Sequence, residues 1–349
     1  MFTLSNTLKL LLFLIHVIFP ISNSHIESLS VIIQRDELHN ALLGDLEMIK
    51  VITDNISDDL SSYENSKAKI QLTELIKQTN SSLSNILEDK KNSKKKKGSY
   101  VAQCELSATV LMFCCEPEEI VAIPKRIRSR TDVFDCKVMS QIELNASRVY
   151  SDRIKLRSPS MGFVSYLSNP SIIRAFEKQQ IPLVYTTTHS DVYMILDEIN
   201  NICETAGKKC YGHLLKNFVN LVIEFSKLKK QSLKIKYHLE PNILYLQHYE
   251  NHYGFTENHL LIKLTKHLGI KSANEKITGG YTKKMSDEKL YMINPDIVFI
   301  SSACQIVTKK NCLNMNTKYI PLNDTIANSP TQLIGLLAYD LVATLEQCT

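Results

Sequence analysis

The sequence contains no tryptophan and lacks the short motifs that mark the common enzyme classes. There is no Gly-x-Ser-x-Gly nucleophile elbow, no P-loop, no His-Glu-x-x-His zinc motif and no Gly-x-Gly-x-x-Gly dinucleotide fingerprint. The glycine pair Gly279 and Gly280 is only a loop signal. These absences exclude the motif-defined hydrolases, NTPases and zinc proteases, and we expect a protein that is not an enzyme.

A membrane-spanning apolar run is also missing at the N-terminus. The run from Leu10 to Phe19 is shorter than the about 20 residues that a bilayer requires. Lys9 precedes the run and Ser22 to Ser24 follow it, which is the pattern of an export signal, with an uncleaved anchor as the alternative. No cysteine follows closely, so a lipoprotein anchor is not indicated. We expect residues 1–24 to be a signal peptide and the mature protein to lie in an oxidising compartment.

Nine cysteines are present, and none has the Cys-x-x-Cys spacing of a zinc or redox site. The odd number leaves at least one thiol without an intramolecular partner. For Cys114 and Cys115, burial as small apolar residues is the favoured interpretation. Two pairs flank short segments and are candidate disulfides in an oxidising compartment: Cys203 with Cys210, and Cys304 with Cys312.

Strong charge of one sign is absent as well, because the net charge is only +5. Much of this charge comes from one lysine run in residues 90–98, KKNSKKKKG. A solvated linker is favoured over a nucleic-acid-binding face, and no nucleic acid partner is expected.

The order of apolar segments predicts the architecture. Residues 25–98 show apolar positions at three- and four-residue spacing, which predicts a helical extension that ends in the lysine-rich linker. From Tyr100 onward short apolar strands alternate with helices, and this alternation resumes after a long helical stretch that is broken near Gly207. We predict an α/β fold of two parallel-sheet lobes joined by one long helix, with lobe 1 at 99–209, the linking helix at 210–232 and lobe 2 at 233–349.

Residues 285–301, MSDEKLYMINPDIVFIS, carry the clearest local signals for secondary structure in the chain. Ser286 is placed to cap a helix whose positive first turn carries Asp287 and Glu288. Pro295 ends the helix, and Ile-Val-Phe-Ile then forms a buried parallel strand.

Four blocks together carry a resemblance to a known family: residues 99–124, 169–186, 260–300 and 319–345. In this order they resemble the periplasmic substrate-binding proteins of ABC importers for cobalamin, haem and ferric siderophores. The resemblance covers roughly residues 99–346, and its most specific part lies between Lys283 and Ile300. It implies two rigid lobes that capture a small iron or corrinoid ligand in the periplasm and deliver it to a membrane permease.

The resemblance also implies where the permease docks. An exposed glutamate near a helix start in each lobe of such proteins pairs with permease arginines, and Glu288 matches this position in lobe 2. A simple capping carboxylate is the alternative role. In lobe 1 the corresponding position is Ser147 and the Pro-Asp pair is missing, so Glu143 is the nearest substitute. Symmetrical docking therefore stays open.

Ligand contacts are expected from loops at the carboxyl ends of the strands. Residues 246–259, LQHYENHYGFTENH, are unusual because they are rich in imidazole and phenol groups, which bind iron. His248 ends a strand and matches the place of an axial haem histidine in what resembles the haem-binding branch, whereas His259 is expected to begin a helix. The ligand-binding candidates in this segment are His248, Tyr249, His252 and Tyr253, with simple solvation as the alternative for each.

Lobe 1 has no histidine between His39 and His189, which argues against a zinc or manganese site built from both lobes. Tyr166 ends a predicted strand and is the second candidate iron ligand or stacking ring, with ordinary packing as the alternative. Arg126 and Arg128 follow the second strand and suit haem propionates or siderophore carboxylates, with a solvated loop as the alternative.

The lack of tryptophan removes a common aromatic wall of cobalamin sites and favours haem or a ferric siderophore as the ligand, with no covalent cofactor. The alternative function is an extracytoplasmic partner-binding protein, or an enzyme, that retains the two-lobed fold without transport.

Overall fold

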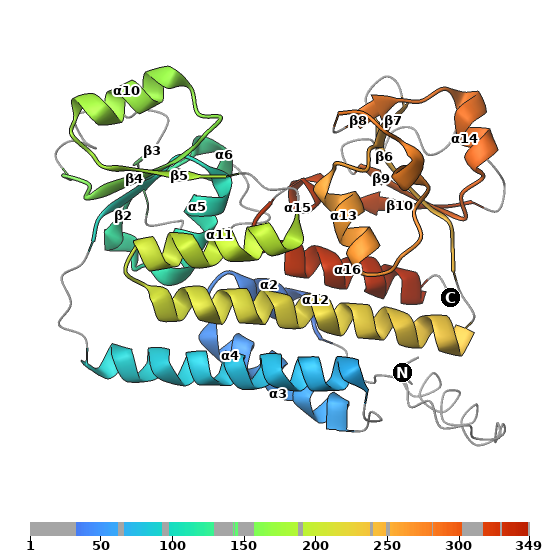
Figure 1. The fold of residues 1–349 in the computed structure, drawn as a ribbon, viewed down its shortest axis with the longest axis horizontal. Helices are drawn as coiled ribbons and strands as arrows, with labels where there is room; N and C mark the ends of the chain where they lie inside the picture. The colour runs from blue at the N-terminus through green and yellow to red at the C-terminus, as the bar shows by residue number, and fades with distance from the viewer. Residues whose placement is uncertain are drawn as a thin grey trace, which may run out of the picture.

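The computed structural model describes residues 33–61, 66–92, 98–128, 142, 144–145, 157–187, 191–237, 240–248, 252–280, 282–301, 317–328 and 330–347 (Figure 1). The predicted export signal lies outside the described residues, as do Glu143, Ser147, Tyr249 and the cysteine pair Cys304 and Cys312. Within the described part of the chain, no helix is long and apolar enough to span a membrane.

Three helices precede the first strand: α2 (Arg35–Leu42), α3 (Leu46–Ser61) and α4 (Lys67–Asn92). Lobe 1 contains β1 (Tyr100–Ala102), α5 (Glu105–Cys114), β2 (Ile120–Ile123), α6 (Lys125–Arg128), β3 (Leu144–Asn145), β4 (Met161–Ser165), α10 (Pro170–Lys178), β5 (Leu183–Thr186) and α11 (Val192–Thr205). After α12 (Lys209–Tyr237), lobe 2 contains β6 (Ile243–His248), β7 (His252–Phe255), α13 (Leu260–His267), β8 (Thr282–Lys284), α14 (Asp287–Ile293), β9 (Ile297–Ser301), β10 (Lys318–Leu322), α15 (Asp324–Ala327) and α16 (Ile334–Gln347).

Lobe 1 holds a fully parallel sheet in the order β3-β2-β1-β4-β5, as the sequence pattern predicts. Strands β1 and β2 are buried at every position, because helices cover both faces of a parallel sheet. Helix α10 begins at its cap Asn169, whose side chain accepts from the Ser171 backbone N–H, and Pro170 occupies its first position.

Lobe 2 holds a mixed sheet in the order β10-β9-β6-β7-β8. Strands β6, β9 and β10 are parallel, as predicted, but β7 and β8 are antiparallel to their neighbours. The prediction of a loop after β6 was therefore wrong in part. A connection as short as that between β6 and β7 leads only to an antiparallel neighbour, since a parallel crossover takes a dozen or more residues.

The predicted block in lobe 2 is confirmed in detail. The Ser286 side chain accepts from the Lys289 backbone N–H at 3.3 Å and so caps α14. Asn294 ends the helix in the left-handed conformation at φ 42°, and Pro295 follows it. Strand β9 then enters the sheet between β10 and β6.

Helices α11 and α12 lie side by side below the two sheets in the view of Figure 1. The break between them, from Thr205 to Lys209, falls where the sequence predicts it. Gly207 adopts φ +70°, which a side chain would disfavour. Gly212 on α12 lies so close to Cys203 that an added Cβ would approach the Cys203 Cβ to 2.8 Å. This close approach allows α12 to pack along α11.

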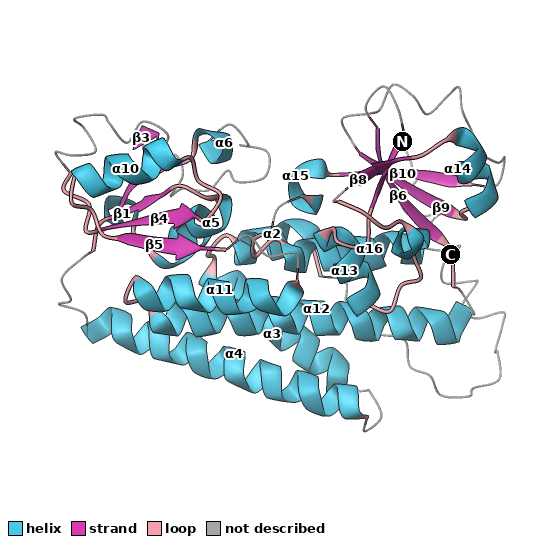
Figure 2. Cartoon of the chain, turned by 45° about the horizontal axis from the view of Figure 1, so that its top comes forward, coloured by secondary structure: helices cyan, strands magenta, loops and turns pink. Residues whose placement is uncertain are grey.

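The N-terminal helices form a layer against α12 and α16, on the side away from the two sheets (Figures 1 and 2). Helix α4 lies along α12, and α2 contacts α16. Arg35 donates to both Asp340 carboxylate oxygens, at 3.0 Å from Nε to Oδ1 and 3.1 Å from Nη2 to Oδ2, and the Tyr339 hydroxyl donates to the Ile33 carbonyl at 2.7 Å. The layer is thus bound to the C-terminal helix by polar contacts.

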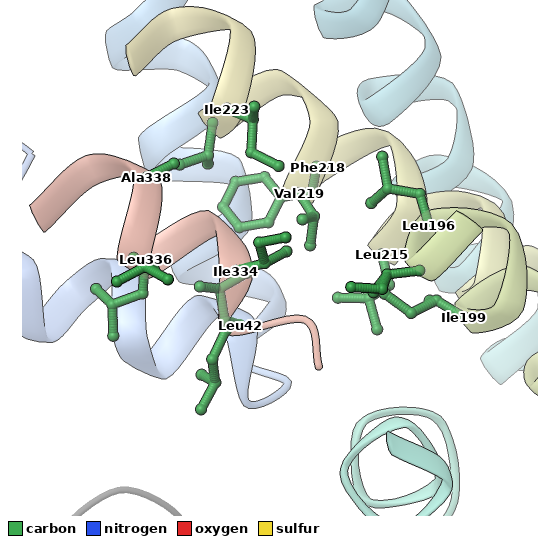
Figure 3. Close-up of a cluster of buried hydrophobic side chains, with 14 of the residues drawn as sticks. Leu42, Leu196, Ile199, Leu215, Phe218, Val219, Ile223, Ile334, Leu336 and Ala338 are labelled. Carbon is green, nitrogen blue, oxygen red and sulfur yellow. The ribbon is translucent and has the colours of Figure 1, made fainter. Parts of the chain in front are cut away.

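One hydrophobic core joins this layer to both lobes (Figure 3). Leu42 from α2, Val219 from α12 and Ile334 from α16 meet in it, all fully buried. The backbone of α16 comes close to both partners at Gly335, where an added Cβ would lie in ordinary van der Waals contact with Val219 at 3.6 Å and Leu42 at 3.7 Å. The N-terminal helices are therefore part of the folding unit.

The candidate disulfide between Cys203 and Cys210 was a wrong prediction, because both cysteines are free. Cys203 is fully buried on α11, whereas the Cys210 sulfur lies 3.8 Å from Asp89 Oδ2 of α4. The two thiols have different neighbours. The predicted burial of Cys114 and Cys115 is confirmed, at 4% and 6% exposure.

We expect Leu42→Ala to lower the free energy of unfolding of the whole protein by about 2–5 kcal/mol, because it opens a cavity in the shared core. The matched control is Ile70→Ala on α4, where the side chain is 69% exposed and the change should stay within about 0.5 kcal/mol. Urea unfolding followed by circular dichroism and tyrosine fluorescence measures both. A separate early transition for the N-terminal helices, or an unchanged midpoint in Leu42→Ala, would contradict a single folding unit.

Candidate functional site

The two sheets carry their carboxyl ends on the sides of the lobes that face each other. Helix α6, which follows β2, lies on the side of lobe 1 nearest lobe 2, and α15, which follows β10, lies on the side of lobe 2 nearest lobe 1 (Figures 1 and 2). Ligands of open α/β sheets bind beyond the carboxyl ends of the strands. The candidate site therefore comprises the described residues at the carboxyl ends of β1, β2, β4 and β5 in lobe 1, and of β6, β9 and β10 in lobe 2.

An exposed pair of stacked tyrosines marks this edge of lobe 1. Tyr166 directly follows β4, as predicted, and its ring stacks on Tyr185 of β5 with centroids 5.1 Å apart and an interplanar angle of 27°. The two side chains are 65% and 40% exposed, and Leu167 beside them is 87% exposed. Tyr166 is thus not a simple packing residue, because most of its surface faces solvent.

Tyr185 was missed by sequence reasoning. It lies in the predicted strand IPLVYTT, but its meeting with Tyr166 depends on the register in which β4 pairs with β5. Side chains alternate between the two faces of a strand, so Tyr185 projects to the same face as the half-buried Leu183. This alternation is the sequence signal from which the direction of the Tyr185 side chain could have been predicted. A pair of stacked rings offers a flat apolar surface with hydroxyl groups at its rim.

The ends of β1 and β5 are joined by a small polar network. Cys104 caps α5, and its sulfur lies 2.9 Å from the Ser107 hydroxyl and 3.0 Å from the Thr186 hydroxyl. Thr186 in turn donates to the Val164 carbonyl at 3.1 Å. This network fixes the strand ends beneath the tyrosine pair, a role that sequence reasoning did not assign to Cys104.

In lobe 2 the predicted ligand segment forms a hairpin. The register pairs His248 of β6 with His252 of β7, which brings the two backbones opposite each other. Tyr249 falls outside the described residues, and nothing is described of the side chains of His248 and His252. The structure thus brings the two histidine positions together but does not place their imidazoles.

The next pairs in this register form a polar row across three strands. Gln247 of β6 pairs with Tyr253 of β7, and Tyr253 pairs with Lys284 of β8. Residues directly opposite one another project to the same face of a sheet. Gln247 and Tyr253 are half-buried and Lys284 is exposed, so the row offers an amide, a phenol and an ammonium group on one face. Sequence reasoning missed Gln247 and Lys284 because the antiparallel strands were not predicted.

Arg126 and Arg128 lie on α6, a single helical turn after β2, and not in the predicted loop. Their side chains fall outside what the structure describes. Pro124 precedes the turn, and its carbonyl accepts from the Ile127 backbone N–H at 3.1 Å. The backbone positions follow the carboxyl end of β2, as expected.

Glu288 is exposed in the first turn of α14, which fits either of its predicted roles. Across the described residues, no group of three or more His, Cys, Asp or Glu side chains has an arrangement that would hold a metal ion.

His259 is a structural residue. Its Nδ1 accepts from the Leu261 backbone N–H at 3.2 Å and caps α13, its Nε2 lies 3.0 Å from Asn328 Oδ1, and its ring stacks on Phe255 at 4.1 Å. These contacts require the neutral ring with the proton on Nε2. Burial lowers the pKa of His259 to about 4, against a smaller opposing effect of the Asn328 hydrogen bond. The expectation that His259 begins a helix is confirmed.

This histidine makes the stability of the fold depend on pH. Between pH 6.5 and about pH 4 the unfolded chain binds a proton at His259 that the folded chain does not bind, so stability falls as the pH falls through this window. We expect a loss of roughly 2–3 kcal/mol from this residue on going from pH 7 to pH 4. His259→Asn keeps a capping side chain and removes the titration, so its unfolding free energy should fall less over the same range. Urea unfolding at both pH values measures the difference.

The matched control is His213→Asn, since His213 is an exposed histidine on α12. This control should keep the pH dependence of the wild type. Equal pH dependence in wild type and His259→Asn would contradict the assignment.

Comparisons with known proteins agree with this geometry. No family model and no curated protein matches the chain. Among solved structures, a possible iron-binding periplasmic solute-binding protein from Staphylococcus epidermidis superposes with a TM-score of 0.59 at 13% identity, covering 72% of this chain and 99% of that chain. The periplasmic haem-binding protein RhuT from Roseiflexus gives 0.54 at 13% over 72% and 99%, and FhuD2 from Staphylococcus aureus with bound ferrioxamine B gives 0.55 at 12% over 72% and 98%.

These matches cover nearly the whole length of each neighbour but leave more than a quarter of this chain without a counterpart. The neighbours are binding proteins and not enzymes. From the shared architecture of two α/β lobes on one long helix, we conclude that this chain has the fold of the periplasmic substrate-binding proteins that serve ABC importers.

Proposed function

We propose that the protein is an extracytoplasmic solute-binding protein that captures an iron chelate, either haem or a ferric siderophore, and delivers it to the permease of an ABC importer. A corrinoid such as cobalamin is the third ligand of this class. The observation that carries the proposal is the fold itself, with the carboxyl ends of both sheets on the facing sides of the lobes. The structural neighbours include a haem-binding protein and a protein with bound ferrioxamine B, which supports this ligand class.

The proposed ligand contacts come from both lobes. Tyr166 supplies a phenol and, with Tyr185, an exposed ring surface. His248 and Tyr166 are the proposed iron ligands, because imidazole nitrogen and phenolate oxygen both bind ferric iron. The remaining proposed contacts are Tyr249, His252, Tyr253, Arg126 and Arg128.

The proposed permease contacts are Glu288 in lobe 2 and Glu143 in lobe 1. Glu288 is exposed on α14, where a permease side chain can reach it. The proposed location is the periplasm, where the haem-binding neighbours of the same fold act.

A partner-binding protein that uses its N-terminal helices for interaction is not favoured. Those helices share the buried core with the linking helix, so most of their apolar side chains are buried, while Val51, Ile70 and Leu87 are exposed. We propose no enzymatic activity for this protein, in line with the binding proteins among its structural neighbours.

The first test is a titration of the mature protein with hemin, followed by the Soret band, with cobalamin and ferrioxamine B in parallel. Saturable one-to-one binding of one of the three is the expected result. For hemin, Tyr166→Phe keeps the stacked ring and removes the phenol oxygen, so loss of the Soret shift in this variant would assign iron ligation, whereas loss only in Tyr166→Ala would assign ring stacking.

His248→Ala tests the second iron ligand, and we expect it to weaken hemin binding at least about tenfold, since an axial ligand contributes more than 1.4 kcal/mol. The matched control His213→Ala removes an exposed histidine from the linking helix and should bind as the wild type does. Failure of all three ligands to bind would overturn the proposed function.

A further inference from the structure

The turn between β4 and α10 presents two large apolar side chains to solvent. Tyr166 and Leu167 occupy the two central positions of this turn, which the Ser168 backbone N–H closes by donating to the Ser165 carbonyl at 2.8 Å. Turn positions more often hold Gly, Pro, Asn, Asp or Ser, whose backbone preferences or short polar side chains stabilise a turn. The turn itself therefore does not explain two bulky apolar residues at its tip.

Two serine hydroxyls stabilise the conformation of this tip. The Ser168 hydroxyl accepts from the Ser165 backbone N–H at 3.0 Å, and the Ser165 hydroxyl accepts from the Leu167 backbone N–H at 3.2 Å. Thr186 at the end of β5 donates to the Val164 carbonyl at 3.1 Å, which ties the neighbouring strand to the same edge of the sheet. The exposed side chains are thus carried by a backbone that is held in place by its own hydrogen bonds.

Tyr185 extends the tip into a flat surface. Val164 pairs with Tyr185 in the parallel register, and Tyr166 comes two residues after Val164, so the two rings meet side by side. They lie at 27° with centroids 5.1 Å apart, which is an arrangement that aromatic pairs favour. One face of the Tyr166 ring is against Tyr185, so its 65% exposure comes mainly from the opposite face and the rim. Together with Leu167 these rings form the tyrosine platform.

The chemistry of the tyrosine platform favours a planar aromatic ligand. Exposed apolar patches with a polar rim mark binding sites on soluble proteins. A flat conjugated ring system can extend the stack of Tyr166 and Tyr185, and its apolar edge can contact Leu167. A hydroxamate chelate such as ferrioxamine B wraps its chain around the iron and has no flat face of this kind.

We infer that the tyrosine platform recognises the flat face of a porphyrin without using the iron, so that a metal-free porphyrin also binds at this site. The inference rests on the proposed function and names the part of the ligand that the lobe 1 edge selects. Stacking needs only the conjugated macrocycle, whereas ligation by a phenol or an imidazole needs the metal. Removing the iron from the ligand therefore separates the two contributions.

The test titrates the full mature chain with hemin and with protoporphyrin IX, which is the same macrocycle without iron, and follows the Soret band of each. We expect saturable one-to-one binding of both. Tyr185→Ala removes one ring of the stack and should weaken the binding of both ligands at least about tenfold. Tyr185→Phe keeps the ring and should bind both as the wild type does.

Further variants separate stacking from iron ligation and from general surface effects. His248→Ala should weaken the binding of hemin and leave that of protoporphyrin IX unchanged, because the imidazole has no iron to bind in the second ligand. Leu167→Ala should weaken the binding of both ligands. The matched control Leu87→Ala removes a 49% exposed leucine from α4 and should weaken neither. Thermal midpoints equal to that of the wild type establish that each variant is folded.

The outcomes distinguish this inference from the proposed function. Binding of hemin without binding of protoporphyrin IX would overturn the inference, as would equal binding of protoporphyrin IX by the wild type and Tyr185→Ala, and both results leave the capture of an iron chelate standing. Binding of ferrioxamine B or cobalamin alone would likewise overturn only the selection of a porphyrin. Failure of all four ligands to bind would overturn the proposed function and the inference together.

Discussion

Helix α12 imposes the constraint on which the rest of the structure depends. From Leu214 to Phe225 nine of the twelve side chains are buried, and the other three, Lys216, Asn217 and Asn220, are half-buried. A helix that buries so many apolar side chains has to be packed by other elements on most of its circumference. Helix α11 covers one side, α16 a second and α4 a third, so the linking helix lies inside a helical layer and not on its surface (Figure 1). The N-terminal helices are thus explained by the composition of a segment more than a hundred residues away.

Enclosure of α12 also holds the two lobes in a fixed relation. Thr109 of α5 donates to the Gln332 side chain at 2.8 Å, and the Gln332 amide donates back to the Thr109 carbonyl at 3.1 Å, with both residues buried. On the other side of the layer, His267 of α13 lies 2.8 Å from Glu224 of α12 and packs edge-on against Tyr193 of α11. Hinge closure would break these contacts, because each joins elements that move with different lobes. A site between such lobes is preorganised.

The sequence predicted those parts of the fold that are encoded locally. The cap at Ser286, the stop at Pro295 and the break at Gly207 depend on a few neighbouring residues, and all three are present. The hairpin after β6 was not predicted, because β8 has three exposed residues and owes its existence to pairing with β7. In the same way Tyr166 could be placed from the end of its strand, whereas its partner Tyr185 and the row of Gln247 with Lys284 depend on strand register.

The two lobes differ in the chemistry that they place at the facing edges. Lobe 1 exposes the rings of Tyr166 and Tyr185, a flat and largely apolar surface. Lobe 2 presents the amide, phenol and ammonium groups of Gln247, Tyr253 and Lys284 in one row, which suits oxyanions. A bare metal ion requires several converging ligands, which neither surface provides. A neutral sugar offers no negative group to pair with the Lys284 ammonium. Under the proposed function, an amphiphilic chelate with one planar face and acidic substituents is the solute whose chemistry matches both surfaces, and this asymmetry is the physical reason to test iron chelates before other solutes.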